Sequence, residues 1–160
     1  MIVVSNTSPI TNLAAINQLS LLLQYGNILV PQAVYNEMVA VGKVVAGSVE
    51  VQTFEWIQNT EVVNRALVTA LELELHSGEA EAIALAIELN ADLLLLDERQ
   101  ARIVALRFGL KFTGILGILI ELKHKGTISA VKPVLDDLIA IAGFWITKPL
   151  YQRVLESAGE

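Results

Sequence analysis

The stretch GEAEAIALAIELNADLLLLDERQAR, residues 78–102, constrains the fold more than any other part of the chain. Its pattern predicts a helix over about residues 79–90, a tight turn, and a buried strand over residues 93–97. The helix would rise roughly 16 Å at 1.5 Å per residue. The strand would return over about 16 Å at 3.3 Å per residue. Because the two lengths match, we expect Glu79 and Asp97 to lie at the same end of the domain.

Short apolar runs alternate with helical segments along the rest of the chain, which is typical of a parallel sheet covered by helices on both faces. We therefore predict one domain over residues 1–160, of the three-layer α/β/α class, with a central parallel sheet of about five strands. The expected strands are residues 2–5, 28–30, 61–63, 93–97 and 110–113, with a further short one at 144–147. Ser8 is expected to cap the first helix and Pro9 to begin it.

Composition narrows the class of protein. With 54% hydrophobic and 18% charged residues, the 160 residues suit a single domain with a large core. The net charge of −6 argues against broad, unspecific nucleic-acid binding, but it leaves room for a local basic patch. The chain has no cysteine, which excludes disulfides and zinc–thiolate sites. We expect a cytoplasmic protein, because no signal-peptide pattern and no apolar run long enough to span a bilayer is evident.

Four polar residues fall at the expected strand ends and helix starts. Asn6 ends the first strand, Glu37 lies in the helix after the second, Glu79 opens its helix and Asp97 ends its strand. In a parallel sheet these positions share the carboxyl edge, where open α/β sheets bind their ligands. Hard cations such as Mg²⁺ and Mn²⁺ take oxygen ligands from carboxylates. The set therefore predicts a metal site able to activate water and stabilise a phosphodiester undergoing displacement.

Each of these residues also has a simpler explanation when taken alone. Asn6 could shape the turn before the first helix, and Glu37 could be a solvated acid on a helix face. Glu79 is favoured in a first turn by the helix dipole, and Asp97 could cap the helix that follows it. It is the occurrence of all four at one sheet edge that favours the metal site.

Basic residues follow Asp97 directly. Arg99 and Arg102 are the better candidates for contacts to a phosphate backbone. Neither a dinucleotide-binding nor a P-loop glycine pattern occurs, and His76 and His124 show no ligand spacing. The aromatic residues are expected in the core or at an interface; they are Trp56, Phe108, Phe144 and Trp145.

Together these segments resemble a PIN domain, the nuclease fold of VapC-type toxins, and are closest to a PIN-like subgroup of small prokaryotic proteins of uncertain role. The resemblance rests on VVSNTSPI, VPQAVYNEM, SGEAEAIALA and LLLLDERQAR with the following GLKFTGILGIL, and it spans nearly the whole chain. It implies Mg²⁺- or Mn²⁺-dependent cleavage of RNA, a small antitoxin partner and a homodimer. By position, Glu37, Glu79 and Asp97 match acidic metal ligands, and Ser8 matches a hydroxyl residue near the first acid.

Asn6 departs from the family pattern, which has Asp at this position. An amide oxygen can still bind a cation, but it brings no charge. At about 4 Å and an effective dielectric near 20, the lost carboxylate costs Mg²⁺ up to about 8 kcal/mol before desolvation and repulsion are counted. Weaker metal binding and slower catalysis are the expected consequences.

Three functions follow from the sequence. The first is a metal-dependent ribonuclease, the toxin-like half of a toxin–antitoxin pair, with Asn6 as a neutral fourth ligand. The second is a catalytically weak or inactive PIN-like module that binds RNA or a protein. The third is a phosphoacceptor domain, which is disfavoured because Asn6-Thr7 stands where such a domain needs paired acids.

Overall fold

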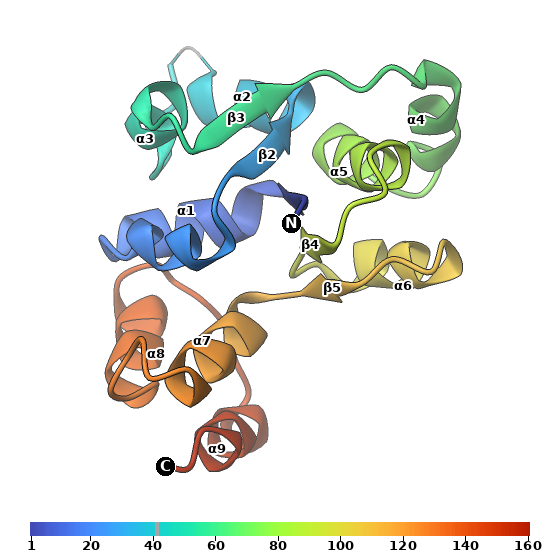
Figure 1. The fold of residues 1–160 in the computed structure, drawn as a ribbon. Coiled ribbons are helices and arrows are strands. Elements are labelled where there is room, and N and C mark those ends of the chain that lie inside the picture. The colour runs from blue at the N-terminus through green and yellow to red at the C-terminus, as the bar shows by residue number, and fades with distance from the viewer. Residues whose placement is uncertain (41) are drawn as a thin grey trace.

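Helices cover both faces of a single parallel sheet in the computed structural model, which describes residues 1–40 and 42–160 (Figure 1). The described strands follow the order β3-β2-β1-β4-β5, all parallel. This confirms the predicted three-layer α/β/α class. The strands are β1 (Val3–Ser5), β2 (Ile28–Pro31), β3 (Ile57–Thr60), β4 (Leu93–Leu95) and β5 (Phe112–Thr113). The helices are α1 (Thr7–Ala15), the 3-10 helix η1 (Leu19–Tyr25), α2 (Gln32–Val39), α3 (Ser48–Thr53), α4 (Arg65–Leu71), α5 (Ser77–Glu88), α6 (Arg99–Arg107), α7 (Ile115–His124), α8 (Lys132–Ala140) and α9 (Lys148–Ser157).

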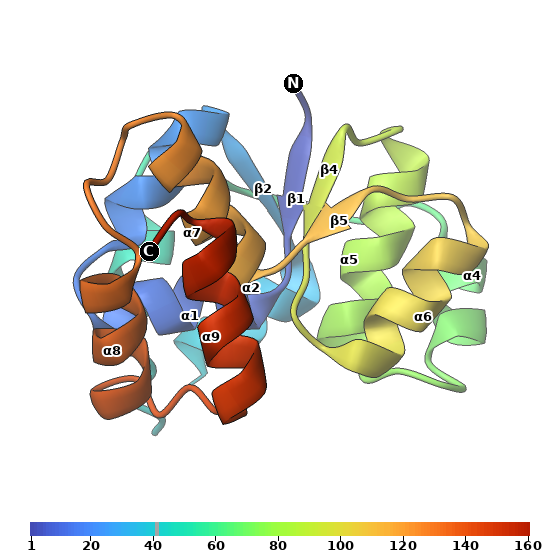
Figure 2. The same ribbon diagram turned by 90° about the horizontal axis from the view of Figure 1, so that it is seen from below.

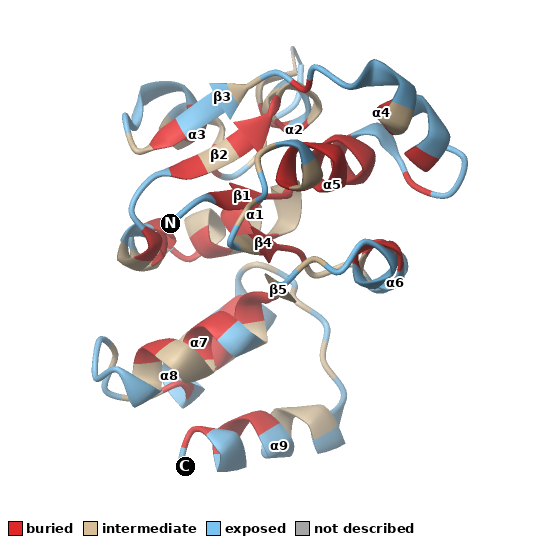
Figure 3. Ribbon diagram, turned by 45° about the vertical axis from the view of Figure 1, so that its right-hand side comes forward, coloured by how far each residue is buried: buried red, intermediate tan, exposed pale blue. Residues whose placement is uncertain are grey.

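Alternate residues of the central strands face opposite helical layers, as the two-residue period of a strand requires. Val3 and Leu95 belong to the core cluster shared with α1, α7 and α8, whereas Val4 and Leu94 belong to the cluster shared with α4, α5 and α6. Figure 2 shows these two layers on either side of the sheet. Helix α5 is buried along most of its length (Figure 3), which explains why its sequence is rich in alanine.

The turn between α5 and β4 has the geometry that the opening stretch predicts. Asn90 adopts the left-handed conformation, with φ of 50°, just after the C-cap residue of α5. The backbone N–H of Ala91 donates to the carbonyl of Ala86 at 2.9 Å, and that of Asn90 donates to Ile87 at 3.2 Å. This pair of bonds is a Schellman motif, which ends the helix and reverses the chain. Helix and strand therefore run antiparallel, as expected.

Three local predictions are wrong. The third strand is Ile57–Thr60 rather than residues 61–63, because Ile57 pairs with Ile28 of β2 and the buried Val62 belongs to the core beyond the strand end. Residues 144–147 form no strand with any described neighbour. The first helix begins at Thr7, with Asn6 rather than Ser8 in the N-cap position. Within the described part of the chain, no helix has the length and apolar character needed to cross a membrane.

The central strand β4 offers a test of this packing. Leu95 is fully buried between the β1 strand and the α7 side of the core. We expect Leu95→Ala to lower the free energy of unfolding by about 2–5 kcal/mol, because it removes apolar contacts and leaves a cavity. Leu73→Ala is the matched control, since its side chain is 87% exposed, and should change stability by less than about 0.5 kcal/mol. Urea unfolding measures both; equal losses would contradict this description of the core.

Candidate functional site

The four residues predicted to share an edge do so in the structure. Asn6 directly follows β1, Glu37 lies on α2 just after β2, and Asp97 lies two residues beyond the end of β4. Glu79 is in the first turn of α5. Because the strands are all parallel, these positions meet at the carboxyl edge of the sheet.

Asn6 is almost completely buried at this edge, with 1% of its surface exposed. Its side chain makes no helix-capping bond although it occupies the N-cap position of α1. Instead, its Nδ2 donates to Oε2 of Glu98 at 2.9 Å. Its Oδ1 is buried and has no hydrogen-bond partner among the described residues. The turn-shaping explanation of Asn6 therefore does not describe its side chain.

Glu98 is a site residue that the sequence reasoning missed. Besides the bond from Asn6, its Oε1 accepts a short hydrogen bond from the hydroxyl of Ser8. Two donors hold its carboxylate at the junction of β1, α1 and the start of α6. The only signal in the sequence was its position directly after Asp97, at the expected start of a helix. Acidic residues are common at helix starts. The structure brings Ser8 to the site as a partner of Glu98.

Glu37 and Glu79 are linked through His76. The imidazole Nδ1 lies 3.6 Å from Glu37 Oε1, and Nε2 lies 3.2 Å from Glu79 Oε1. Thr7 fixes the other side of Glu37 by donating to its Oε2 at 2.6 Å. Gly78 makes this approach possible, because a Cβ there would stand 2.4 Å from Glu37 Oε1. Neither His76 nor Thr7 was predicted, since their contacts join α2 to segments distant in sequence.

Burial dominates the electrostatics of Glu79 and Asp97. Desolvation raises the pKa of Glu79, and the negative charges of Glu98 and Glu37 raise it further, against the opposing effect of His76. Desolvation also raises the pKa of Asp97, opposed by the backbone N–H of Ile115 and by Arg102. Both acids are therefore held in an environment that disfavours their charged form.

Asp97 is held on one side only. Its Oδ1 accepts from the N–H of Ile115, the first residue of α7, at 3.1 Å and lies 3.8 Å from Nη2 of Arg102. Asp97 thus caps α7 rather than the α6 helix that follows it. Its Oδ2 is buried and, within the described chain, makes no hydrogen bond. Gly114 admits this packing, because a Cβ there would meet Oδ1 at 2.3 Å.

Of the two predicted arginines, the structure brings Arg102 to the acids and leaves Arg99 apart from them. Arg102 donates through Nε to the carbonyl of Leu96 at 2.9 Å, and its guanidinium stacks 5.3 Å from the ring centre of Phe112. Arg99 is exposed in the first turn of α6 and forms no ion pair with any described residue.

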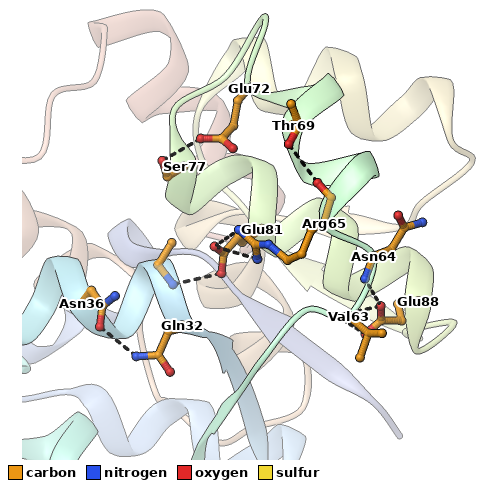
Figure 4. A network of polar contacts seen from close by, with 11 residues as sticks. Gln32, Asn36, Val63, Asn64, Arg65, Thr69, Glu72, Ser77, Glu81 and Glu88 are labelled. Atoms are coloured by element: carbon orange, nitrogen blue, oxygen red, sulfur yellow. Dashed lines mark hydrogen bonds and ion pairs between the residues drawn. The ribbon is translucent and has the colours of Figure 1, made fainter.

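A second buried acid on α5 has a structural role. Glu81 accepts from the backbone N–H of Ala33 at 3.1 Å and from both terminal nitrogens of Arg65 (Figure 4). It therefore fastens α5 to the first turn of α2 and to α4. The bond to Ala33 orients α2, the helix that carries Glu37. Glu81 itself lies on a different helix face from Glu79, because residues two positions apart on a helix do not share a face.

A PIN domain family model matches residues 2–160, nearly the whole chain. The chain belongs to the PIN domain family. PIN domains are in general nucleases, and they usually depend on a divalent metal ion. No curated protein sequence matches the chain.

The site of this PIN domain fits a divalent ion in part. In residues 1–40 and 42–160, no three His, Asp or Glu side chains are grouped closely enough to hold a metal ion by themselves. Two buried oxygens just beyond the ends of the adjacent strands β1 and β4 nevertheless have no partner there: Oδ1 of Asn6 and Oδ2 of Asp97. A buried unpaired oxygen costs about 1–3 kcal/mol. Amide and carboxylate oxygens are ligands that hard cations accept, so these two atoms suit a Mg²⁺ or Mn²⁺ ion that keeps several waters.

The raised pKa of Asp97 predicts a gain in stability when its charge is removed. A carboxyl whose pKa is raised on folding stabilises the protein fully below its unfolded value of about 3.9 and loses that contribution as pH rises through the folded value. At pH 7, Asp97→Asn should therefore raise the Tm of the metal-free PIN domain. Each kcal/mol gained corresponds to about 2–4 °C in a chain of this size. The gain should vanish below about pH 4, where Asp97 is protonated in both states.

Asp136→Asn is the control, because folding shifts the pKa of Asp136 in the opposite direction to that of Asp97. Hydrogen bonds from Lys132 and Tyr151 lower the pKa of Asp136, so removal of its charge should not stabilise the protein at pH 7. Thermal melts of both variants at the two pH values decide the point. If Asp97→Asn raises the Tm equally at low pH, the rise in Tm does not arise from removal of the buried charge.

Proposed function

We propose that this PIN domain is a metal-dependent ribonuclease. The observation that carries the proposal is the pair of buried, unpartnered oxygens, Asn6 Oδ1 and Asp97 Oδ2, at the edge that also holds Glu37 and Glu79. These four residues would hold Mg²⁺ or Mn²⁺. A bound ion would generate a nucleophilic hydroxide at neutral pH and neutralise the charge that develops on the phosphodiester.

The protein side chains would have separate roles in positioning the water and the phosphate. Asp97, whose Oδ2 has no partner in the described chain, would hold the ion and so help to orient and activate the attacking water. Arg102 is fixed through its Nε, and its terminal nitrogens donate no hydrogen bond to the described chain, so they can contact a phosphate oxygen. Arg99, exposed in the first turn of α6, is a second candidate for the phosphate backbone. Ser8 would act by holding Glu98 in place.

The resemblance to VapC-type toxins supports a more specific biological role. We propose that the chain is the toxin-like partner of a small antitoxin, that it forms a homodimer and that it acts in the cytoplasm. Co-purification with the product of an adjacent small reading frame tests the first point, and the mass in solution tests the second.

RNA cleavage with Mn²⁺ tests the nuclease directly. We expect the protein to cleave single-stranded RNA and Asp97→Ala to reduce the rate by at least about 100-fold, because a ligand of the ion that activates the attacking water is lost. Asp136→Ala is the matched control, because Asp136 lies on α8 and is bound to Lys132 and Tyr151. Cleavage that survives Asp97→Ala at the control rate would sink the assignment.

A catalytically silent PIN module is the second candidate. The observation that favours it is the Asn6 amide, which donates to Glu98 and adds no charge where the family has an acid. Metal-dependent stabilisation separates the two functions. A working site should raise stability by about 2.7 kcal/mol when Mn²⁺ is at 100 times its Kd, whereas no shift at millimolar Mn²⁺ would favour the silent module.

Asn6→Asp sharpens this comparison. Without metal, we expect the variant to melt at a lower temperature, because a carboxylate would replace the amide that donates to Glu98 and would face a like charge. With Mn²⁺, its Tm should rise by more than that of the unchanged protein, since a charged ligand strengthens cation binding. Asn27→Asp makes the same charge change at the opposite, amino end of β2 and is the control. If Asn6→Asp binds Mn²⁺ no more tightly, Asn6 does not lie beside the ion.

A further inference from the structure

A groove of about 590 Å³ lies between α7 and α9 and opens beside the acidic site. Asp97 and Arg102 line one part of it, and the segment between α8 and α9 contributes Trp145. The volume is within the range of about 300–1,000 Å³ typical of small-ligand pockets. The groove therefore runs from Asp97 onto a surface formed by α7, α9 and the segment that precedes α9.

Trp145 is the most unusual residue of this groove, because 81% of its surface is exposed. The sequence predicts it in the core or at an interface, and the structure excludes the core. Phe144 lines the same groove from the preceding position. Exposed aromatic rings beside a nuclease site are the surfaces on which unpaired bases of single-stranded nucleic acids stack.

The arginines of the groove are opposite in sign to the net charge of the chain. The chain carries a net charge of −6, yet the groove contains two arginines, Arg102 and Arg153. Arg153 is exposed on α9 and has no acidic partner among the described residues. A guanidinium without a carboxylate partner is free to bind a phosphate oxygen.

We propose that this groove binds the single-stranded RNA next to the cleavage point, with a base stacked on Trp145 and a backbone phosphate on Arg153. The proposal rests on the ribonuclease function proposed above and names the form of its substrate. Stacking needs an unpaired base, so the groove selects single strands over duplexes. Because every base offers a flat face, the groove tolerates different sequences.

Fluorescence of Trp145 itself reports on the groove. The chain has two tryptophans, so Trp56→Phe leaves Trp145 as the only indole. Titration with a short single-stranded oligouridine RNA in EDTA, which prevents metal-dependent cleavage, should quench this fluorescence. An RNA duplex of the same length should bind more weakly and quench less. Absence of quenching, or equal quenching by the duplex, overturns the proposal.

Affinity measurements on two variants complete the test. Trp145→Ala should weaken oligouridine binding about 5- to 150-fold, the range for loss of one stacked base. Arg153→Gln should lower the slope of log K against log salt by about 0.7, as expected for one phosphate contact to a single strand. The matched controls are Phe108→Ala, which removes a ring 46% exposed away from this groove, and Arg107→Gln, whose arginine is paired with Glu74; neither should change binding.

The two proposals fail in different ways. Trp145-dependent RNA binding without Mn²⁺-dependent cleavage would support the groove and remove the nuclease. Cleavage that is intact, with RNA affinity unchanged by Trp145→Ala, would overturn the groove and leave the nuclease. If Trp145→Ala instead changes the mass of the protein in solution and leaves RNA affinity unchanged, this face is an interface between copies of the chain and the proposal is wrong.

Discussion

The pairing of β1 with β4 is the constraint on which the site depends. The register aligns Val3 with Leu93 and Ser5 with Leu95, and the N–H of Asn6 donates to the carbonyl of Leu95 at 3.0 Å. These two strands lie at the centre of the sheet, with β2 beyond one and β5 beyond the other. Their parallel direction brings the ends of two segments about ninety positions apart to one place. A shift of one residue would turn the core-facing side chains of β4 to the other layer.

The acidic side chains of the site lie where burial disfavours their charged form. Desolvation raises the pKa of both Glu79 and Asp97, and the carboxylate of Glu98 adds repulsion to each. The nearby cations oppose this only in part, because Arg102 stands 3.8 Å from Asp97. Such an arrangement costs folding stability, as functional sites commonly do. Its consequence is that a positive charge placed beside these acids would lower the cost of burying them.

The sequence predicted the large features because they depend on local patterns. The run of residues 93–97 and the helix before it were evident from period and length, and with them the placement of Glu79 and Asp97 at one end of the domain. What could not be predicted depends on contacts between distant segments. His76 bridges two acids only after α2 and α5 pack together. The predicted position of β3 was wrong because two apolar residues beyond the strand end, Val62 and Val63, resemble a short strand in sequence, although only Val62 is buried.

The position of Trp145 also could not be predicted from local sequence patterns. The apolar residues 144–147 resemble a final strand in sequence, but β5 has only β4 as a described neighbour and no further strand extends the sheet. The segment instead connects α8 to α9, with Phe144 packed against the core and Trp145 facing outward. Alternation of buried and exposed aromatic residues is common to an edge strand and to an irregular surface segment, so the sequence alone could not separate them.

Asn6 and Glu98 are best understood as one feature. The family pattern has an acid at position 6, whereas Asn6 brings no charge. Four acidic side chains nevertheless lie at this edge, because Glu98 joins the three predicted acids. Glu98 lies within hydrogen-bond distance of the Asn6 amide. Two carboxylates about 3 Å apart would repel by roughly 5 kcal/mol at an effective dielectric near 20. An amide donor avoids this repulsion and directs its free oxygen elsewhere. Glu98 therefore supplies a carboxylate beside the neutral amide, so the amide at position 6 does not leave the edge short of negative charge.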